Sequence, residues 1–256
     1  MTDIDVSRRF GGIARLYGEA ALARFQAAHV AVIGIGGVGS WVAETLARSA
    51  IGTLTLIDLD HVAESNINRQ LHALDTTLGQ AKVTAMADRI RAFNPLAVVY
   101  EVDEFVELDN LSRLIGPQFD FVVDAIDNVK VKAALIAYCR RHKIKLITCG
   151  GAGGQLDPTQ IQIADLARTT QDPLLAKTRS LLRREYGFSK DVKKKFDMPA
   201  VFSTEPLQYP VAAACDVDEP TGGPIGLNCA GFGSSACVTG VFGMVAASYV
   251  LRKLAQ

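Results

Sequence analysis

The chain reads His-Val-Ala-Val-Ile-Gly-Ile-Gly-Gly-Val-Gly from His29 to Gly39. The apolar run before the first glycine predicts a buried strand, and the glycines predict a tight turn that opens a helix. Glycine lets backbone N–H groups approach a phosphate at the helix N-terminus. The stretch therefore predicts a nucleotide-binding strand, turn and helix, with turn glycines Gly34, Gly36, Gly37 and Gly39.

Outward from this unit, apolar runs of strand length alternate with helical stretches. The expected strands are His29–Gly34, Thr53–Asp58, Ala97–Val102, Phe121–Ile126 and Ile144–Cys149. The expected helices are Gly37–Ala50, Gly79–Phe93, 108–115 and Lys130–His142. Strands without polar alternation are buried on both faces, as in a parallel sheet. The order predicts an α/β fold, with five neighbouring strands in a Rossmann-like, doubly wound and mostly parallel sheet.

The pattern changes after residue 150, where a glycine-rich run is followed by shorter elements. We expect one domain over residues 1–256, with a nucleotide-binding half at 1–150 and an insertion-rich, substrate-binding half at 151–256. The second half is expected to hold short strands at Ile161–Ile163 and Ala200–Phe202, a basic helix at Leu174–Tyr186, and mobile loops near 189–198 and 216–228.

Composition excludes several classes of protein. The 256 residues are 49% apolar and carry 27 basic and 27 acidic side chains, so any nucleic-acid binding must rely on local patches. Five cysteines without a CxxC pair argue against a disulfide framework and a structural zinc clamp. Residues 1–12 lack the apolar run of a secretory signal. We therefore expect a reducing, cytoplasmic location.

The second expected strand ends in Asp58-Leu59-Asp60. A carboxylate at that position accepts hydrogen bonds from ribose hydroxyls, and NAD or ATP would satisfy it equally. Arg69 and Lys82 bring two cations toward the phosphates, which suits a triphosphate that releases pyrophosphate. The two cations thus favour ATP over the alternative of an NAD-dependent oxidoreductase.

The order of these motifs resembles the ThiF/MoeB/HesA superfamily of adenylating enzymes, which are related to ubiquitin-activating enzymes. The shared order is GxGGxG, DxD, a segment like SNxxRQ, a GxxK lysine and a later Asp-Asn pair. The resemblance implies that ATP and Mg²⁺ are used to activate a carboxylate. The implied ATP-binding residues are Gly34, Gly36, Gly37, Gly39, Asp58, Asp60, Ser65, Asn66, Arg69, Gln70, Lys82 and Asp127.

The resemblance also implies catalytic roles for four of the charged residues. Arg69 and Lys82 would stabilise the leaving phosphates, and Asp127 would hold the magnesium ion. The alternative for Asp127-Asn128 is a helix N-cap. In a homodimer Arg15, or Arg9 in its place, would reach the phosphate site of the partner, although both could equally be solvated arginines on a surface helix.

Residues 9–18 and 150–160 resemble a bacterial branch of the superfamily that acts on tRNA. This likeness implies ATP-dependent dehydration of threonylcarbamoyladenosine beside the anticodon, through an adenylate and cyclisation. The alternative within adenylation is activation of the C-terminus of a ubiquitin-like sulfur-carrier protein, with sulfur-transfer proteins as partners. No cysteine lies between Cys149 and Cys215 to capture an adenylated tail. Cys229 is expected to be a small buried residue rather than a nucleophile.

Two further segments bear on partners. A local basic stretch could contact tRNA phosphates or form a solvated helix face and charged loop. Residues 236–251 lack charge but fall short of the roughly twenty apolar residues that cross a bilayer, so a core or dimer-interface helix is expected over membrane association. The basic residues are Lys177, Arg179, Arg183, Arg184, Lys190, Lys193, Lys194 and Lys195.

Overall fold

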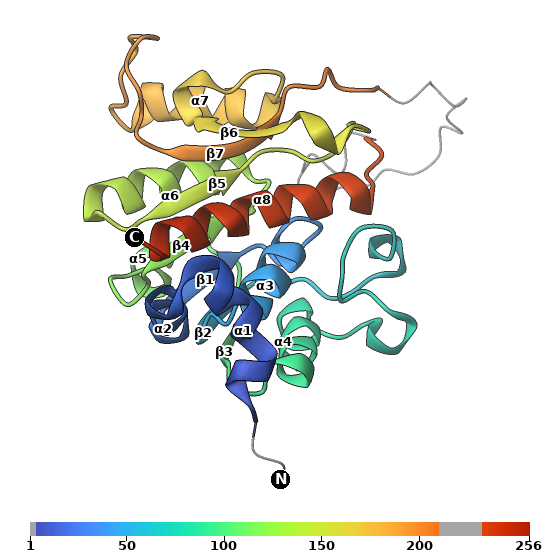
Figure 1. Ribbon diagram of the computed structural model, residues 1–256. Helices are drawn as coiled ribbons and strands as arrows, with labels where there is room; N and C mark the ends of the chain where they lie inside the picture. Colours follow the sequence, from blue (N-terminus) through green and yellow to red (C-terminus); the bar gives the residue numbers. More distant parts are fainter. Residues whose placement is uncertain (1–3, 210–231) are drawn as a thin grey trace.

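A seven-stranded sheet with the order β3-β2-β1-β4-β5-β7-β6 forms the centre of the molecule (Figure 1). The computed structural model describes residues 4–209 and 232–256. The first five strands in this order are parallel neighbours, as predicted, and β6 alone runs antiparallel. The strands are β1 (His29–Ile33), β2 (Thr53–Ile57), β3 (Val98–Val102), β4 (Phe121–Asp124), β5 (Leu146–Cys149), β6 (Ile161–Asp165) and β7 (Pro199–Ser203).

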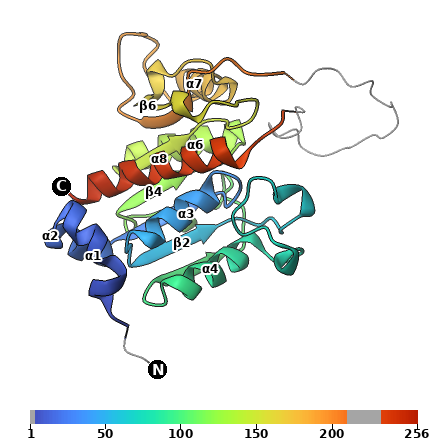
Figure 2. The same ribbon diagram turned by 45° about the vertical axis from the view of Figure 1, so that its right-hand side comes forward.

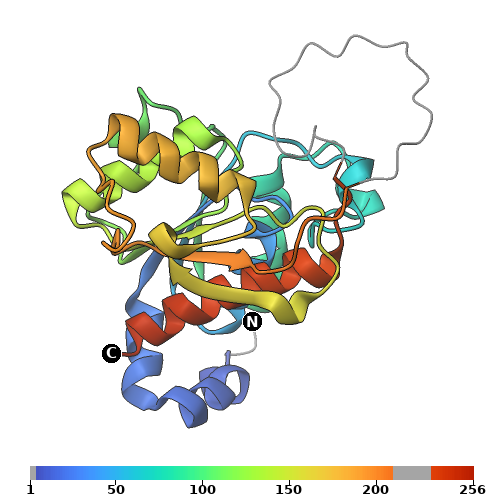
Figure 3. The same ribbon diagram turned by 90° about the horizontal axis from the view of Figure 1, so that it is seen from above.

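Helices cover both faces of the sheet (Figures 2 and 3). Helices α3 (Gly39–Arg48), α4 (Lys82–Phe93) and α8 (Ala236–Leu254) pack on one face. The other face carries α5 (Leu111–Leu114), α6 (Val129–His142) and α7 (Pro173–Glu185). Two helices, α1 (Val6–Tyr17) and α2 (Glu19–Ala27), precede the first strand.

Strand β1 shows why the apolar runs are continuous. Val30 and Val32 point into the core cluster under α3 and α8, whereas Ala31 and Ile33 point into the cluster under α6. Successive side chains of a strand point to opposite faces, and both faces are covered here. All four residues are therefore at most 2% exposed.

The elements begin and end within a few residues of their expected bounds, and local hydrogen bonds explain several differences. The fourth strand was expected to continue to Ile126 but ends at Asp124, because a carboxylate oxygen of Asp124 accepts from the Ile126 N–H at 3.0 Å and turns the chain. Helix α4 begins at Lys82 rather than Gly79, since Ala81 pairs with His61 in a β-bridge.

The second half contains the expected short strands and basic helix. At the end of the segment 189–198, Phe196 and Met198 are buried and their N–H groups donate to Asp165 at 2.9 and 3.1 Å. The expected loop at 216–228, Cys215 and Cys229 lie outside the described residues.

Helix α8 is long and apolar enough to cross a membrane by length and composition, with 19 residues and a mean hydropathy of 1.3. It nevertheless packs along α3, and Val238, Phe242 and Val250 are fully buried. A Cβ added at Gly243 would lie 2.6 Å from the carbonyl oxygen of Val38, so glycine permits this close packing. The expectation of a core helix is confirmed.

Candidate functional site

The site lies at the carboxyl ends of β1 and β4, where the strand order changes direction. Ligands of open α/β sheets bind at such a point. Gly34 has a φ of 85°, and a Cβ there would lie 2.9 Å from the carbonyl oxygen of Ala125. A Cβ at Gly39 would overlap the carbonyl oxygen of Gly34. The protein's own backbone therefore requires both glycines.

Gly36 is different, because nothing in the fold requires it. The nearest atom to a Cβ at Gly36 would be the amide nitrogen of Gln70, 4.0 Å away. The Gln70 side chain is buried, and its oxygen has no hydrogen-bond partner among the described residues. The Gln70 amide nitrogen, an N–H donor, is the group that faces this turn, and an open backbone turn beside such a donor fits a phosphate-bearing ligand. Gly37 lies nearby, under the aliphatic stem of Arg69.

Asp58 ties the glycine turn to β2. Its carboxylate accepts from the Ile35 N–H at 2.6 Å and from the Asp60 N–H at 2.9 Å. Burial raises the pKa of Asp58, although these backbone bonds and Lys82 act in the opposite direction. Each oxygen can accept a second bond, so the expected ribose contact stays a prediction.

Lys82 and Asp60 form an ion pair at the edge of the site. The Lys82 ammonium lies 2.8 Å from a carboxylate oxygen of Asp60. The lysine side chain is buried while that of Asp60 is half exposed. Solvent therefore reaches the pair from the Asp60 side, and the phosphate-binding role of Lys82 stays a prediction.

The segment between Asp60 and Lys82 folds back on itself. In the turn η1 (Glu64–Asn66), the Asn66 side-chain oxygen accepts from the Ala63 N–H at 3.1 Å. Arg69 donates to the Ser65 carbonyl oxygen at 2.8 Å, and the Ser65 side chain is exposed. Ser65, Asn66 and Arg69 therefore lie next to one another. The Asn66 side-chain oxygen, however, is already bonded to a backbone N–H.

Asp127 and Asn128 differ in their contacts. Asn128 is the N-cap of α6, because its side-chain oxygen accepts from the N–H groups of Lys130 and Val131 at 3.0 and 3.3 Å. Asp127 is exposed and makes no hydrogen bond within the described residues. No cluster of three or more metal-ligating side chains occurs in that part of the chain. A single carboxylate is nevertheless enough to hold a magnesium ion when phosphate oxygens supply its other ligands.

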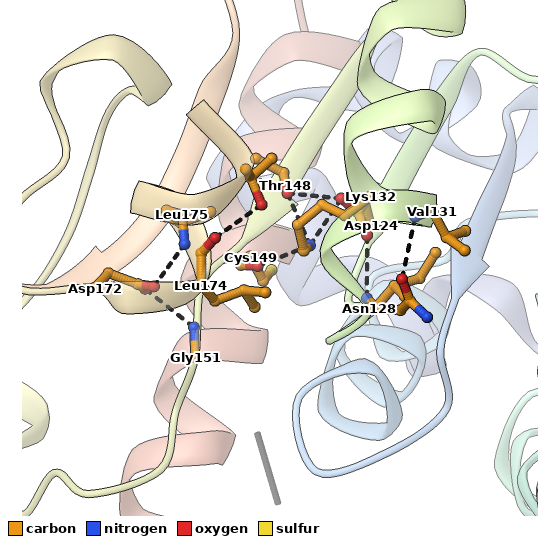
Figure 4. A network of polar contacts seen from close by, with 12 residues as sticks. Asp124, Asn128, Val131, Lys132, Thr148, Cys149, Gly151, Asp172, Leu174 and Leu175 are labelled. Atoms are coloured by element: carbon orange, nitrogen blue, oxygen red, sulfur yellow. Dashed lines mark hydrogen bonds and ion pairs between the residues drawn. The ribbon is translucent and has the colours of Figure 1, made fainter. Parts of the chain in front are cut away.

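A buried polar network beside the site was not predicted (Figure 4). The Lys132 ammonium donates to Asp124 at 2.8 Å, and to the Thr148 hydroxyl and the Cys149 carbonyl oxygen at 3.0 Å each. Neither charged side chain has any exposed surface. Because Asp124 also fixes the Ile126 N–H, the network sets the loop that carries Asp127.

Asp172 extends this support to the glycine-rich segment after β5 (Figure 4). It caps α7 by accepting from the Leu175 N–H at 2.9 Å, and its second oxygen accepts from the Gly151 N–H at 3.0 Å. Burial raises the pKa of this carboxyl. No sequence motif reveals the pairing, since 21 residues separate its partners.

The remaining expected residues lie apart from this edge or are inert. Arg9 donates to the Phe93 carbonyl oxygen at 2.6 Å, at the end of α4 opposite Lys82 and about 16 Å from it. Arg15, on the same helix as Arg9, is exposed. Cys139 and Cys149 are at most 1% exposed, which confirms them as core thiols, and burial raises the pKa of both to about 12.

Known proteins match nearly the whole chain. The sequence is 54% identical to tRNA threonylcarbamoyladenosine dehydratases of Haemophilus influenzae and Escherichia coli, over 96% of this chain and 93% of each relative. The crystal structure of the Escherichia coli enzyme with ATP aligns with a TM-score of 0.87 and 52% identity, covering 97% of this chain and 94% of that one. The sequence profile of the ThiF family matches residues 8–256. The chain therefore belongs to the ThiF family.

Proposed function

We propose that the protein catalyses the ATP-dependent dehydration of threonylcarbamoyladenosine in tRNA to its cyclic form. Relatives of that name share 54% identity over almost the full chain, and a solved relative binds ATP. The structural observation that supports the proposal is the open turn at Gly36, which the Gln70 amide nitrogen faces as an N–H donor. These findings favour this function over sulfur-carrier activation and over NAD-dependent oxidation.

The chemistry needs no protein nucleophile. A threonyl carboxylate oxygen attacks the α-phosphorus of ATP, and the bond to the bridging oxygen breaks to release pyrophosphate. The carbamoyl group of the same nucleoside then attacks the activated carbonyl carbon and loses a proton to solvent. A five-membered ring closes, and AMP leaves with the carboxylate oxygen. Attack within one molecule supplies much of the rate advantage.

The charged residues at the strand ends have distinct tasks in this scheme. Arg69 and Lys82 face the charge that grows on the leaving pyrophosphate. Asp60 holds the Lys82 ammonium until a phosphate competes for it. Asp127 would hold Mg²⁺ together with phosphate oxygens, and the bound ion would neutralise phosphate charge.

We further propose a homodimer in which Arg15 enters the site of the partner. The placement of Arg9 at the far end of α4 supports this, because an arginine there lies a helix length away from Lys82 of its own chain. Mixed dimers of Arg15→Ala and Lys82→Ala chains test the arrangement, since each mixed dimer would keep one intact site. Activity should reappear on mixing, whereas an arginine that acts on its own site would leave the mixture inactive.

The basic stretch supports tRNA contact through only some of its residues. Arg183 donates to the Ser189 carbonyl oxygen at 3.2 Å and lies over the Phe196 ring, so it is committed to the fold. The exposed members are Lys177, Arg184, Lys190, Lys193, Lys194 and Lys195. A cytoplasmic location agrees with the core packing of α8, and sulfur-transfer partners stay a prediction of the superfamily resemblance.

The direct test is incubation with ATP and threonylcarbamoylated tRNA, followed by nucleoside mass spectrometry. We expect loss of one water and release of one AMP per nucleoside. Gly36→Ala should abolish ATP binding without unfolding, because its Cβ meets no protein atom closer than 4.0 Å. Gly12→Ala is the matched control, since its Cβ meets nothing within 4 Å. Full activity of Gly36→Ala would contradict the phosphate site.

A further inference from the structure

A cavity of about 420 Å³ lies between the start of α7 and the extended segment that follows β7. Asp172 and Arg179 line one side, and Pro206, Leu207 and Tyr209 line the other. The dehydration chemistry assigned above does not use it.

The cavity connects to the strand ends through Asp172 and Gly154. Asp172 holds the Gly151 N–H just after β5. On the opposite wall, the Gln208 N–H donates to the Gly154 carbonyl oxygen at 2.7 Å, which fixes the segment that carries Tyr209. Both walls are therefore anchored to the same glycine-rich segment.

The spacing between strands β4 and β5 suits the length of the threonylcarbamoyl arm. Asp127 follows β4 and Gly151 follows β5, and neighbouring strands lie about 4.8 Å apart. The threonylcarbamoyl arm from the purine amine to the carboxyl carbon is one peptide unit plus one bond, or about 5 Å. A base held over β5 would thus present its carboxylate over β4, beside Asp127.

The lining suits an unstacked nucleotide. Tyr209 is 73% exposed, and Pro206 and Leu207 add apolar surface, whereas single-stranded bases bind by stacking on aromatic rings. The Arg179 guanidinium is fixed by the Thr169 hydroxyl and the Leu166 carbonyl oxygen through one nitrogen, which leaves further N–H donors for a phosphate.

We propose that this cavity receives the modified adenosine, with the base stacked on Tyr209 and an adjoining phosphate held by Arg179. The proposal rests on the proposed function. It assigns recognition of the nucleoside to the second half of the chain, while the first half binds ATP.

The test compares Tyr209→Ala, Tyr209→Phe and the control Tyr100→Ala, an exposed tyrosine of β3 at the other end of the sheet. Loss of stacking should lower kcat/KM for the modified tRNA about 5- to 150-fold, with ATP affinity unchanged, and phenylalanine should restore it. Arg179→Gln should reduce the salt slope of tRNA binding by about 0.7.

Three results would overturn this inference. The first is a wild-type kcat/KM in Tyr209→Ala. The second is a loss of kcat/KM in Tyr209→Ala that Tyr209→Phe shows as well. The third is an unchanged salt slope of tRNA binding in Arg179→Gln. A wild-type protein that leaves the modified tRNA unchanged would instead contradict the proposed function itself. The two failures are therefore distinguishable.

Discussion

Lys82 and Lys132 both hold an aspartate at 2.8 Å, but the two ion pairs lie in different surroundings. Lys132 and Asp124 have no exposed surface, and two further oxygens accept from the lysine. Lys82 pairs with an aspartate that is half exposed. The fully satisfied pair holds backbone in place, whereas the half-exposed partner of Lys82 is the arrangement expected if that cation binds a ligand.

The largest effect on stability is expected from breaking the buried pair. Lys132→Met would leave Asp124 charged and unpaired, which costs about 3–5 kcal/mol in the free energy of unfolding. Urea denaturation measures this change. The double variant Lys132→Met with Asp124→Leu should recover most of the loss, because it removes both charges. A single variant as stable as the wild type would contradict the support role of the network.

The same substitution at Lys82 should leave stability almost unchanged but lower turnover. Lys82→Met should change the free energy of unfolding by less than about 1 kcal/mol, because Asp60 is solvated. Turnover should fall on the order of 10²- to 10³-fold, since the cation acts on charge that develops in the transition state. AMP release and urea denaturation measure the two quantities. Unchanged turnover would remove Lys82 from the site.

His72 adds a pH-dependent test to the comparison of Lys82 with Lys132. It is buried near Lys82, and its ring has no hydrogen-bond partner among the described residues. Burial, then Lys82 and Arg89, lowers the pKa of His72 to about 4. The unfolded chain, with a pKa near 6.5, binds a proton first as the pH falls. Stability should therefore decline from pH 6.5 to 4, by up to about 3 kcal/mol.

His72→Asn removes this titration and should flatten that decline. The comparison uses urea denaturation of both proteins across the same pH range. Asp58 and Asp172, whose pKa values are raised by burial, are present in both and cancel in the difference. Identical pH profiles would show that His72 is not held neutral.

The smallest expected effect on stability distinguishes Asn128 from its neighbour Asp127. Asn128→Ala removes the cap of α6 and should cost about 1 kcal/mol in the free energy of unfolding. Asp127→Ala should change stability by less than about 0.5 kcal/mol while AMP release is lost. Thermal unfolding followed by circular dichroism measures the first quantity. A larger loss of stability from Asp127→Ala would mean that this carboxylate serves the fold.

Local sequence patterns predicted the elements and the open half of the site. The positions of the glycine turn, Asp58 and Lys82 are recognisable because each of them lies next to a strand or helix end. Lys132 was not predicted, because a lysine in an amphipathic helix is ordinarily solvated, and its burial depends on two separate strands. Asp172 and Gly151 meet only because α7 packs beside β5, which no local pattern encodes.

Helix α8 has a consequence for synthesis on the ribosome. It follows every other described element in the chain, yet it packs on α3 and on strands β5, β6 and β7, and Arg24 of α2 donates to the Leu254 carbonyl oxygen at 3.0 Å. Until residues 236–254 emerge, the nascent chain must keep the apolar surface beneath α8 exposed, and such surfaces promote aggregation. Residues 1–150 precede α8 in the chain, yet their core cluster includes side chains of α8. Early termination before residue 236 should therefore yield chains that depend on chaperones.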